Sequence, residues 1–278
     1  ASLRDDKIAW YKNDGTGNFS EPIYLSCKEI RAQAVIASDL NGDGNIDIVS
    51  ASSGDDKIAW YRNDGLVFSE EILIYTHIEA AEFISSADLD GDNKIDILSA
   101  SSRSNQIGWY RNDGTGNFSK QIIISNEAEG VKALFPIDID QDGDVDVFAA
   151  NGFEDKLVWY RNDGIGAFSK QIIISSDLDL PWSIVGSDLD KDEDVDLIAV
   201  SSIDVKFAWF KNDGIGNFSS PIIISDQLNG ARSVFAADLD KDGNIDLISA
   251  SSIDSKIVWY QNMGNGEFSS QTIISTQA

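Results

Sequence analysis

The sequence has few of the residues on which many catalytic and metal sites depend, with one cysteine and one histidine among 278 residues. The single cysteine, Cys27, excludes an intrachain disulfide and a zinc site built from cysteines. The single histidine, His77, excludes a metal site with several histidines in one copy of the chain. No apolar run approaches the roughly 20 residues of a membrane-spanning helix. We therefore expect no disulfide, no multi-histidine centre and no membrane insertion.

Basic residues are also scarce, since 21 Lys and Arg stand against 47 Asp and Glu, for a formal net charge of −26. Nucleic-acid backbones and anionic membranes need clustered Lys and Arg, so this excess of acid argues against both as partners. The acid is concentrated, because 22 of the 47 acidic residues lie in five short loops. Outside those loops 25 acids stand against 21 bases. The net charge therefore comes from the loops.

The chain repeats with a period near 50 residues, and tryptophan marks the period most clearly. Six tryptophans are separated by 50, 49, 50, 50 and 50 residues: Trp10, Trp60, Trp109, Trp159, Trp209 and Trp259. Such a period indicates a stacked or radial array of one supersecondary unit. We predict a single domain over residues 1–278, with a half blade at 1–27 and full repeats at 29–77, 78–127, 128–177, 178–227 and 228–278.

The sequence of each repeat predicts four short strands. Residues 233–237 are typical of the first strand and 245–250 of the second, while 57–62 carry the periodic tryptophan of the third and 121–125 are the β-branched fourth. The Asn-Asp-Gly-x-Gly sequence between the third and fourth strands favours a hairpin turn, because Gly and Asn tolerate positive φ. No segment sustains a 3.6-residue apolar period, so we expect almost no helix.

The fold class expected is all-β, a β-propeller of four-stranded blades with five complete repeats and an N-terminal half blade. Small sheets that are apolar on both faces suit a propeller, in which each blade packs between two neighbours. A solenoid is the alternative, but it would need polar terminal caps. Residues 1–27 supply only a third and a fourth strand. Either the chain is part of a longer propeller, or the half blade pairs unusually, for example with another copy in a homo-oligomer.

The five acidic loops are the strongest candidates for chemistry. Counted from their first aspartate, they carry oxygen ligands at positions 1, 3 and 5, a tight turn at 6, a backbone carbonyl at 7 and an aspartate at 9. The predicted metal residues are Asp39, Asn41, Asp43, Asn45 and Asp47; Asp88, Asp90, Asp92, Lys94 and Asp96; Asp138, Asp140, Asp142, Asp144 and Asp146; Asp188, Asp190, Asp192, Asp194 and Asp196; and Asp238, Asp240, Asp242, Asn244 and Asp246.

This spacing resembles the first half of an EF-hand loop, with the aspartate at position 9 in place of the glutamate at 12. Oxygen ligands without nitrogen or sulfur suit a hard cation, so we expect up to five Ca²⁺ ions, one in each complete repeat. The alternative is five solvated acidic turns, but clustered like charges repel one another without a cation. Position 6 should need a positive φ, which Gly44, Gly143 and Gly243 adopt freely and which is strained at Glu193.

The repeated motif resembles the FG-GAP/VCBS repeat family. The resemblance is carried by Asp-Leu-Asp-x-Asp-Gly-x-x-Asp-Leu, then Ala-Ser-Ser, Lys-Ile-x-Trp-Tyr and Asn-Asp-Gly-x-Gly-x-Phe-Ser, and it covers essentially the whole chain. It implies an integrin-α-like, calcium-stabilised propeller used for binding or adhesion outside the cell, and thus a secreted or cell-surface protein. Two features depart from the family. The Phe-Gly…Gly-Ala-Pro signature of integrin blades is missing, and position 6 is Asn93 in the second loop and Glu193 in the fourth.

The residues that break the repeat are candidates for ligand contact. Six residues before each acidic loop stand Gln33, Glu82, Lys132, Trp182 and Arg232. We expect them at the start of the innermost strand, around the mouth of a central channel, on the face opposite the calcium loops. The periodic tryptophans are expected to pack between blades, although stacking on sugar rings is an alternative.

Two classes of function follow from these patterns. The first is a non-catalytic recognition or adhesion module, which binds carbohydrate or a protein partner on the variable residues. The alternative is the propeller domain of a polysaccharide-degrading enzyme, which would act through paired carboxylates. Nearly every carboxylate cluster belongs to a repeated loop, and no unique group of acid, base and nucleophile stands out, so we expect no enzyme activity.

Overall fold

The computed structural model of the chain describes residues 6–26, 31–65, 67–76 and 80–277, so Cys27 and His77 lie outside the described residues. The chain divides into two compact units, Ala1–Ala128 and Glu129–Ala278. Of the described residues, only η1 (Gly152–Glu154) is helical, and the rest of the regular structure is strand. None of the helical structure described is long and apolar enough to cross a membrane.

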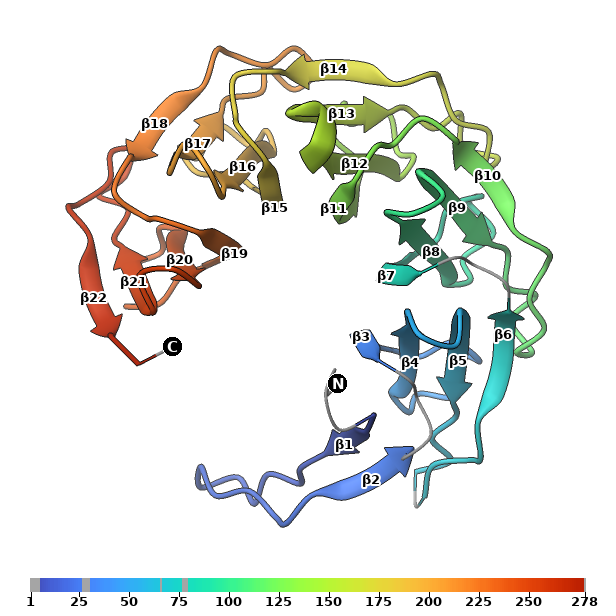
Figure 1. Cartoon of the computed structure of the whole chain (residues 1–278). Coiled ribbons are helices and arrows are strands. Elements are labelled where there is room, and N and C mark those ends of the chain that lie inside the picture. Colours follow the sequence, from blue (N-terminus) through green and yellow to red (C-terminus); the bar gives the residue numbers. More distant parts are fainter. Residues whose placement is uncertain (1–5, 27–30, 66, 77–79, 278) are drawn as a thin grey trace. The chain divides into compact units, whose positions relative to one another are not determined.

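The first unit contains one two-stranded and two four-stranded antiparallel sheets (Figure 1). The two-stranded sheet comprises β1 (Ile8–Trp10) and β2 (Ile23–Ser26). The next sheet comprises β3 (Ala32–Ser38), β4 (Asp47–Ser52), β5 (Lys57–Tyr61) and β6 (Ile72–Thr76). The last comprises β7 (Ala81–Ala87), β8 (Asp96–Ser101), β9 (Gln106–Tyr110) and β10 (Ile122–Ser125). The strands expected in residues 1–27 are thus present as β1 and β2.

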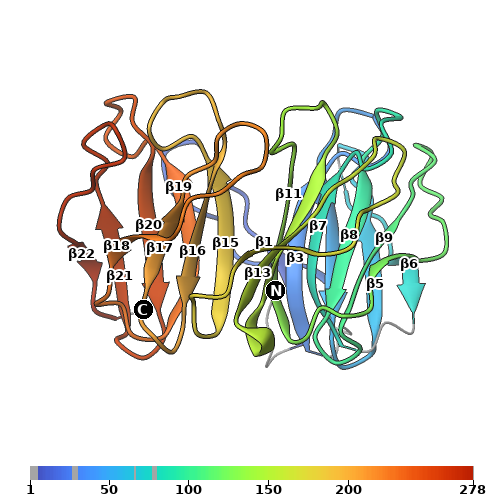
Figure 2. The same cartoon turned by 90° about the horizontal axis from the view of Figure 1, so that it is seen from above.

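The second unit contains three four-stranded antiparallel sheets, each in sequence order. The first comprises β11 (Val131–Ile137), β12 (Asp146–Asn151), β13 (Lys156–Tyr160) and β14 (Ile172–Ser175). The second comprises β15 (Pro181–Ser187), β16 (Asp196–Ser201), β17 (Phe207–Phe210) and β18 (Ile222–Ser225). The third comprises β19 (Ala231–Ala237), β20 (Asp246–Ser251), β21 (Lys256–Tyr260) and β22 (Thr272–Ser275). Figure 2 shows that these strands run between two ends that both carry loops.

Burial follows the order of the strands within each sheet. Every residue of β16 is buried, whereas Ile222 and Ile223 of the outer strand β18 are 41% and 46% exposed. Within the second unit β11 contacts β15, and β15 contacts β19, so the first strands of adjacent sheets lie side by side (Figure 1). The all-β class and the repeated four-stranded sheets are therefore confirmed. Closure of the sheets into one propeller over residues 1–278 stays a prediction.

The periodic tryptophans pack on the neighbouring sheet, as the period suggested. Trp60, Trp159 and Trp209 are 3–5% exposed. Each indole covers the second glycine of the Asn-Asp-Gly-x-Gly turn in the following sheet. A Cβ on Gly216 would lie 2.6 Å from Trp159, and a Cβ on Gly266 would lie 2.3 Å from Trp209. Glycine is required at these turns because the φ angles are positive and because the indole leaves no room for a side chain.

The asparagine of the same turn joins adjacent sheets by hydrogen bonds. The side-chain amide of Asn212 donates to the carbonyl of Ile139, in the acidic loop of the preceding sheet, at 2.9 Å and to that of Val195 at 3.0 Å. Asn262 repeats the contact to Leu189 at 2.8 Å, and both asparagines are buried. A turn that the sequence predicted as a hairpin therefore also fixes one sheet to the next.

We expect Trp209→Ala to destabilise the second unit by about 3–5 kcal/mol, because it empties a buried aromatic site between two sheets. Ile215→Ala, at a residue that is 68% exposed, is the control and should change stability little. Chemical denaturation of both variants measures the difference. Unchanged stability of Trp209→Ala would contradict a packing role for the periodic tryptophans.

Candidate metal centres and the variable face

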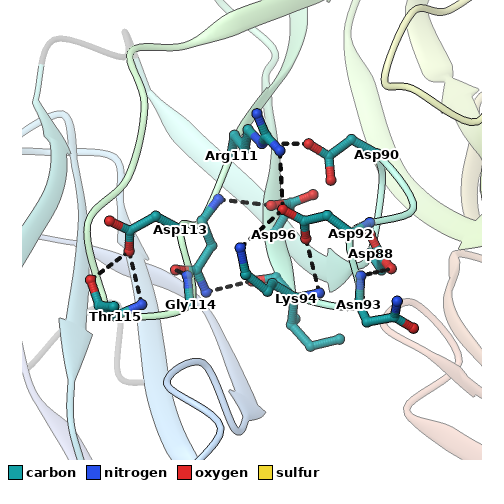
Figure 3. Close-up of polar contacts among 12 residues, drawn as sticks. Asp88, Asp90, Asp92, Asn93, Lys94, Asp96, Arg111, Asp113, Gly114 and Thr115 are labelled. Atoms are coloured by element: carbon teal, nitrogen blue, oxygen red, sulfur yellow. Dashed lines mark hydrogen bonds and ion pairs between the residues drawn. The ribbon is translucent and has the colours of Figure 1, made fainter.

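The first aspartate of each acidic loop holds the loop closed from within. Its carboxylate accepts the backbone N–H of the residue at position 6, for example of Asn93 onto Asp88 at 2.7 Å (Figure 3). The same bond recurs in the other loops, from Gly44 to Asp39 at 2.8 Å, Gly143 to Asp138 at 3.0 Å, Glu193 to Asp188 at 3.2 Å and Gly243 to Asp238 at 3.0 Å. A single backbone conformation is thus imposed on all five loops.

The residue at position 6 has a positive φ in every loop, as the sequence predicted. The angle is 84° at Gly44, 95° at Gly143 and 85° at Gly243, and it is 62° at Asn93 and 73° at Glu193. Glutamate in this region is strained by roughly 1 kcal/mol because its Cβ crowds the backbone. The fourth loop therefore keeps its shape at a cost in stability.

The aspartate at position 9 is the most buried of the candidate ligands in each loop. Asp96 is fully buried, and its two oxygens accept the backbone N–H groups of Asn112 at 2.8 Å and Leu89 at 3.1 Å. Burial raises the pKa of Asp96 and of Asp146 to about 7, and that of Asp196 to about 6. This residue therefore ties the end of the first strand and the turn after the third strand to the loop.

Three loops bring the carboxylates at positions 1, 3 and 9 together. Their oxygens lie within 4.8 Å of one another in Asp88, Asp90 and Asp96; in Asp138, Asp140 and Asp146; and in Asp188, Asp190 and Asp196. In the fifth loop, the group is Asp238, Asp240 and Asp242, at positions 1, 3 and 5. The first loop has Asn41 at position 3, and its predicted ligands form no such three-carboxylate group among the described residues.

The carboxylates at position 5 accept hydrogen bonds from within their own loop. Asp92 accepts the backbone N–H of Lys94 at 3.0 Å, and the Lys94 ammonium lies 3.3 Å from the same carboxylate. Equivalent bonds run from Asn45 to Asp43 at 2.8 Å, Asp144 to Asp142 at 3.1 Å, Asp194 to Asp192 at 3.1 Å and Asn244 to Asp242 at 2.8 Å. The structure therefore gives position 5 a role in the turn, beside the predicted role as a ligand.

A cationic side chain reaches over several of these clusters, a feature that the sequence analysis missed. The guanidinium of Arg111 lies 2.5 Å from Asp90 and 3.1 Å from Asp92 (Figure 3). Arg161 contacts Asp140 and Asp142 at 2.7 and 2.9 Å, and the Lys211 ammonium contacts Asp190 and Asp192. In the fifth loop the neutral Gln261 takes this place and donates to Asp240 at 2.6 Å. The constant spacing of 23 residues from the first aspartate of the loop is the signal that would have revealed it.

The clusters fit a metal ion because some of their buried oxygens have no other partner. The side chains of Asp90 and Asp140 are 7% and 5% exposed, and their Oδ1 atoms find no hydrogen-bond partner in the part of the chain that the structure describes. Asp138 Oδ1, in the same cluster as Asp140, is also buried without a hydrogen-bond partner among the described residues. Unpartnered buried carboxylate oxygens are costly, and a hard cation would satisfy them. The repeated aspartate clusters can therefore hold metal ions.

The repeat-breaking residues all lie in a β-bulge at the start of the first strand of a four-stranded sheet. In β11 the register with β12 shifts between Val131 and Ala133, which leaves Lys132 as the extra residue. The same shift places Gln33, Glu82, Trp182 and Arg232 in the bulges of β3, β7, β15 and β19. A bulge re-aims its side chain out of the sheet ladder. The predicted position at the start of the strand is therefore confirmed, and the position at a channel mouth stays a prediction.

Three comparisons place the chain among known proteins. It is similar to an Agrocybe aegerita lectin described for recognition of non-reducing terminal N-acetylglucosamine, at 19% identity and a TM-score of 0.72, over 98% of this chain and 75% of the lectin. A functionally unknown protein from Desulfotomaculum acetoxidans matches at 9% identity and a TM-score of 0.66, over 97% and 76% of the two chains. An auxiliary nutrient binding protein from Bacteroides ovatus matches at 12% identity and a TM-score of 0.56, over 89% of this chain and 58% of that one.

These likenesses concern the fold, and no curated protein matches the chain significantly. The model of one repeat family matches six times, at residues 1–50, 39–99, 88–149, 138–199, 188–249 and 238–278. The matches overlap at the acidic loops and leave no part of the chain uncovered, in agreement with the resemblance stated from the sequence. The chain therefore belongs to the family of FG-GAP-like repeats.

Proposed function

We propose that the chain is a non-catalytic, calcium-stabilised β-propeller that acts as an extracellular recognition module for carbohydrate or a protein partner. The observation that carries this proposal is the contrast between the two ends of each sheet. One end repeats the same acidic loop, whereas the other places a different side chain in every bulge. A rigid repeated scaffold with variable residues at one end is the usual design of a binding surface.

The relatives support binding as the class of function. The Agrocybe aegerita protein is a lectin and the Bacteroides ovatus protein is a nutrient binding protein. The family resemblance implies calcium, and aspartate clusters with unpartnered oxygens suit that ion.

A glycan array probed with the calcium-loaded protein tests the recognition role. We expect binding to at least one class of glycan, loss of that binding in Trp182→Ala, and no release of reducing sugar from polysaccharides. Trp182 stands in the bulge of β15, at the variable end of its sheet. Release of reducing sugar would favour the degrading enzyme instead. Unchanged binding in Trp182→Ala, combined with loss in variants of the Asn-Asp-Gly turns, would place the ligand elsewhere.

Calcium should stabilise the protein, because an ion that binds only the folded state adds RT ln(1 + [L]/Kd). Extracellular sites of this kind bind with Kd of about 10⁻⁴–10⁻³ M, so each site contributes about 1.4 kcal/mol at ten times Kd. Asp140→Asn should remove one such contribution, and the calcium-free protein should keep its stability because weaker repulsion from Asp138 and Asp142 offsets the lost ion pair with Arg161. Asp226→Asn, at an exposed residue outside the loops, is the control. Thermal unfolding at increasing calcium measures both, and no rise at millimolar calcium would refute the metal proposal.

The internal cations should compete with calcium for the position-3 and position-5 carboxylates. Arg161→Gln removes a positive charge from Asp140 and Asp142, so the calcium-free protein should lose stability and the stabilisation by calcium should increase. The change should be about 1 kcal/mol or less, since the guanidinium side chain is 50% exposed. The reverse variant, Gln261→Arg, should reduce the stabilisation by calcium. Equal calcium responses in both variants and the parent would show that the cations do not compete.

A further inference from the structure

Four side chains at the variable end of the second unit form one alternating stack of cations and aromatic rings. The ammonium of Lys132 lies 4.7 Å from the ring centroid of Phe153 and 4.8 Å from that of Trp182. The guanidinium carbon of Arg232 lies 3.5 Å from the Trp182 ring. Lys132, Trp182 and Arg232 come from the bulges of β11, β15 and β19, and Phe153 comes from η1. Three adjacent sheets thus contribute to a single cluster, here called the cation–aromatic stack.

The backbone around the stack is adapted to it. The residue twenty positions after each bulge is serine in four repeats, but it is Gly152 beside Lys132. A Cβ on Gly152 would lie 2.9 Å from Cγ of Lys132, and a Cβ on Gly130 would lie 2.3 Å from the Phe153 ring. Both contacts are too close for a side chain to be present. Glycine therefore stands where the lysine stem and the phenyl ring need the space.

The two cations of the stack keep their charge available. Within the described part of the chain Lys132 has no ion pair, and Arg232 donates one hydrogen bond, from Nε to Ser252 at 3.2 Å. Neighbouring acids are already engaged, since Glu154 pairs with Lys156 at 2.7 Å and Asp204 with Lys206 at 2.8 Å. An aromatic ring attracts a cation without neutralising it, and a stacked guanidinium still presents donors at its edge.

We propose that the cation–aromatic stack binds the carboxylate of a terminal acidic sugar, such as a hexuronic acid at the end of a glycan. The carboxylate would accept hydrogen bonds from the terminal nitrogens of Arg232, while the Lys132 ammonium, on the other face of Trp182, would donate to a hydroxyl group of the sugar. The apolar face of the sugar would lie against the exposed rim, where Phe153 is 66% exposed and Ile253 is 62% exposed. This proposal deepens the proposed recognition role and rests on it.

The charge of the whole chain selects among anionic ligands. A net charge of −26 repels polyanions such as polyuronates or sulfated chains, which would approach with many charges at once. A single carboxylate is repelled far less, because the repulsion grows with the charge of the ligand and is screened beyond the Debye length of about 8 Å at physiological salt. Charge-assisted hydrogen bonds at contact are retained under these conditions. Among acidic glycans, the net charge therefore favours a ligand with a single acidic sugar at the end of the glycan.

Calorimetric titration of the calcium-loaded protein with three matched disaccharides tests the proposal. One ends in glucuronic acid, one in the methyl ester of the same acid and one in glucose. We expect the acid to bind at least about tenfold more tightly than the ester or the neutral sugar, since one charge-assisted contact contributes roughly that factor. The ester keeps the size and ring of the acid and removes only its charge, so the difference reports on the carboxylate.

The protein variants remove the charges one at a time. Arg232→Gln should reduce affinity for the acid about tenfold and leave the weak binding of the ester unchanged, whereas Lys132→Gln should weaken the binding of acid and ester alike. Lys170→Gln makes the same charge change at an exposed residue outside the stack and should have no effect. Thermal unfolding of each variant at the same calcium concentration shows whether it is folded.

Three outcomes would overturn the inference, and they separate it from the proposed function. Equal affinity for the acid and the ester would show that no carboxylate is recognised, while a positive glycan array would leave the recognition role standing. Acid binding that survives both variants but is lost with a calcium chelator would place the sugar at the acidic loops. Failure to bind all three disaccharides, together with a blank array, would refute both proposals.

Discussion

The structure depends on one buried carboxylate in each complete repeat, the aspartate at position 9 of the acidic loop. In Asp196 the two oxygens accept N–H groups from Leu189, next to the end of the first strand, and from Asn212, in the turn after the third strand. A buried carboxylate is tolerated only when such partners surround it. The same residue contributes an oxygen to the metal cluster. Strand ends, turn and cluster are therefore fixed by a single group, which explains why the loop recurs so faithfully along the chain.

The opposite end of each sheet is free to vary for a structural reason. The bulge removes its extra residue from the ladder, so the hydrogen bonds of the first strand do not depend on which side chain stands there. The start of that strand is held instead by a neighbouring acid, as when Asp155 accepts the backbone N–H of Leu180 at 2.9 Å. Glutamine, glutamate, lysine, tryptophan and arginine thus occupy equivalent bulges without disturbing the sheet. Chemistry at this end can change while the fold stays the same.

The sequence predicted what repeats locally and missed what depends on neighbouring sheets. Periodicity located the strands and the buried tryptophans, and the EF-hand-like spacing predicted positive φ at position 6, even at Glu193. The bond from Asn212 to Ile139 spans 73 residues, so no local pattern indicates it. Arg161 and Lys211 repeat at a fixed distance from their loops, but basic residues before a turn are easily taken for solvated charges. The bulge residues could be identified from the sequence because they vary between repeats. Their stacking could not, because it depends on the first strands of adjacent sheets lying side by side.

The two ends of each sheet also differ in how their charges are balanced, and this difference explains why the cations of the stack keep their charge. At the loop end, acids outnumber bases, and arginine, lysine or a metal ion must offset the repulsion. At the bulge end, acids pair with lysines two residues later in the chain, as Glu154 does with Lys156. Those local pairs leave Lys132 and Arg232 with aromatic rings as their main contacts. In a chain of net charge −26, cations held by rings and not by carboxylates are the groups best able to recognise a negative charge.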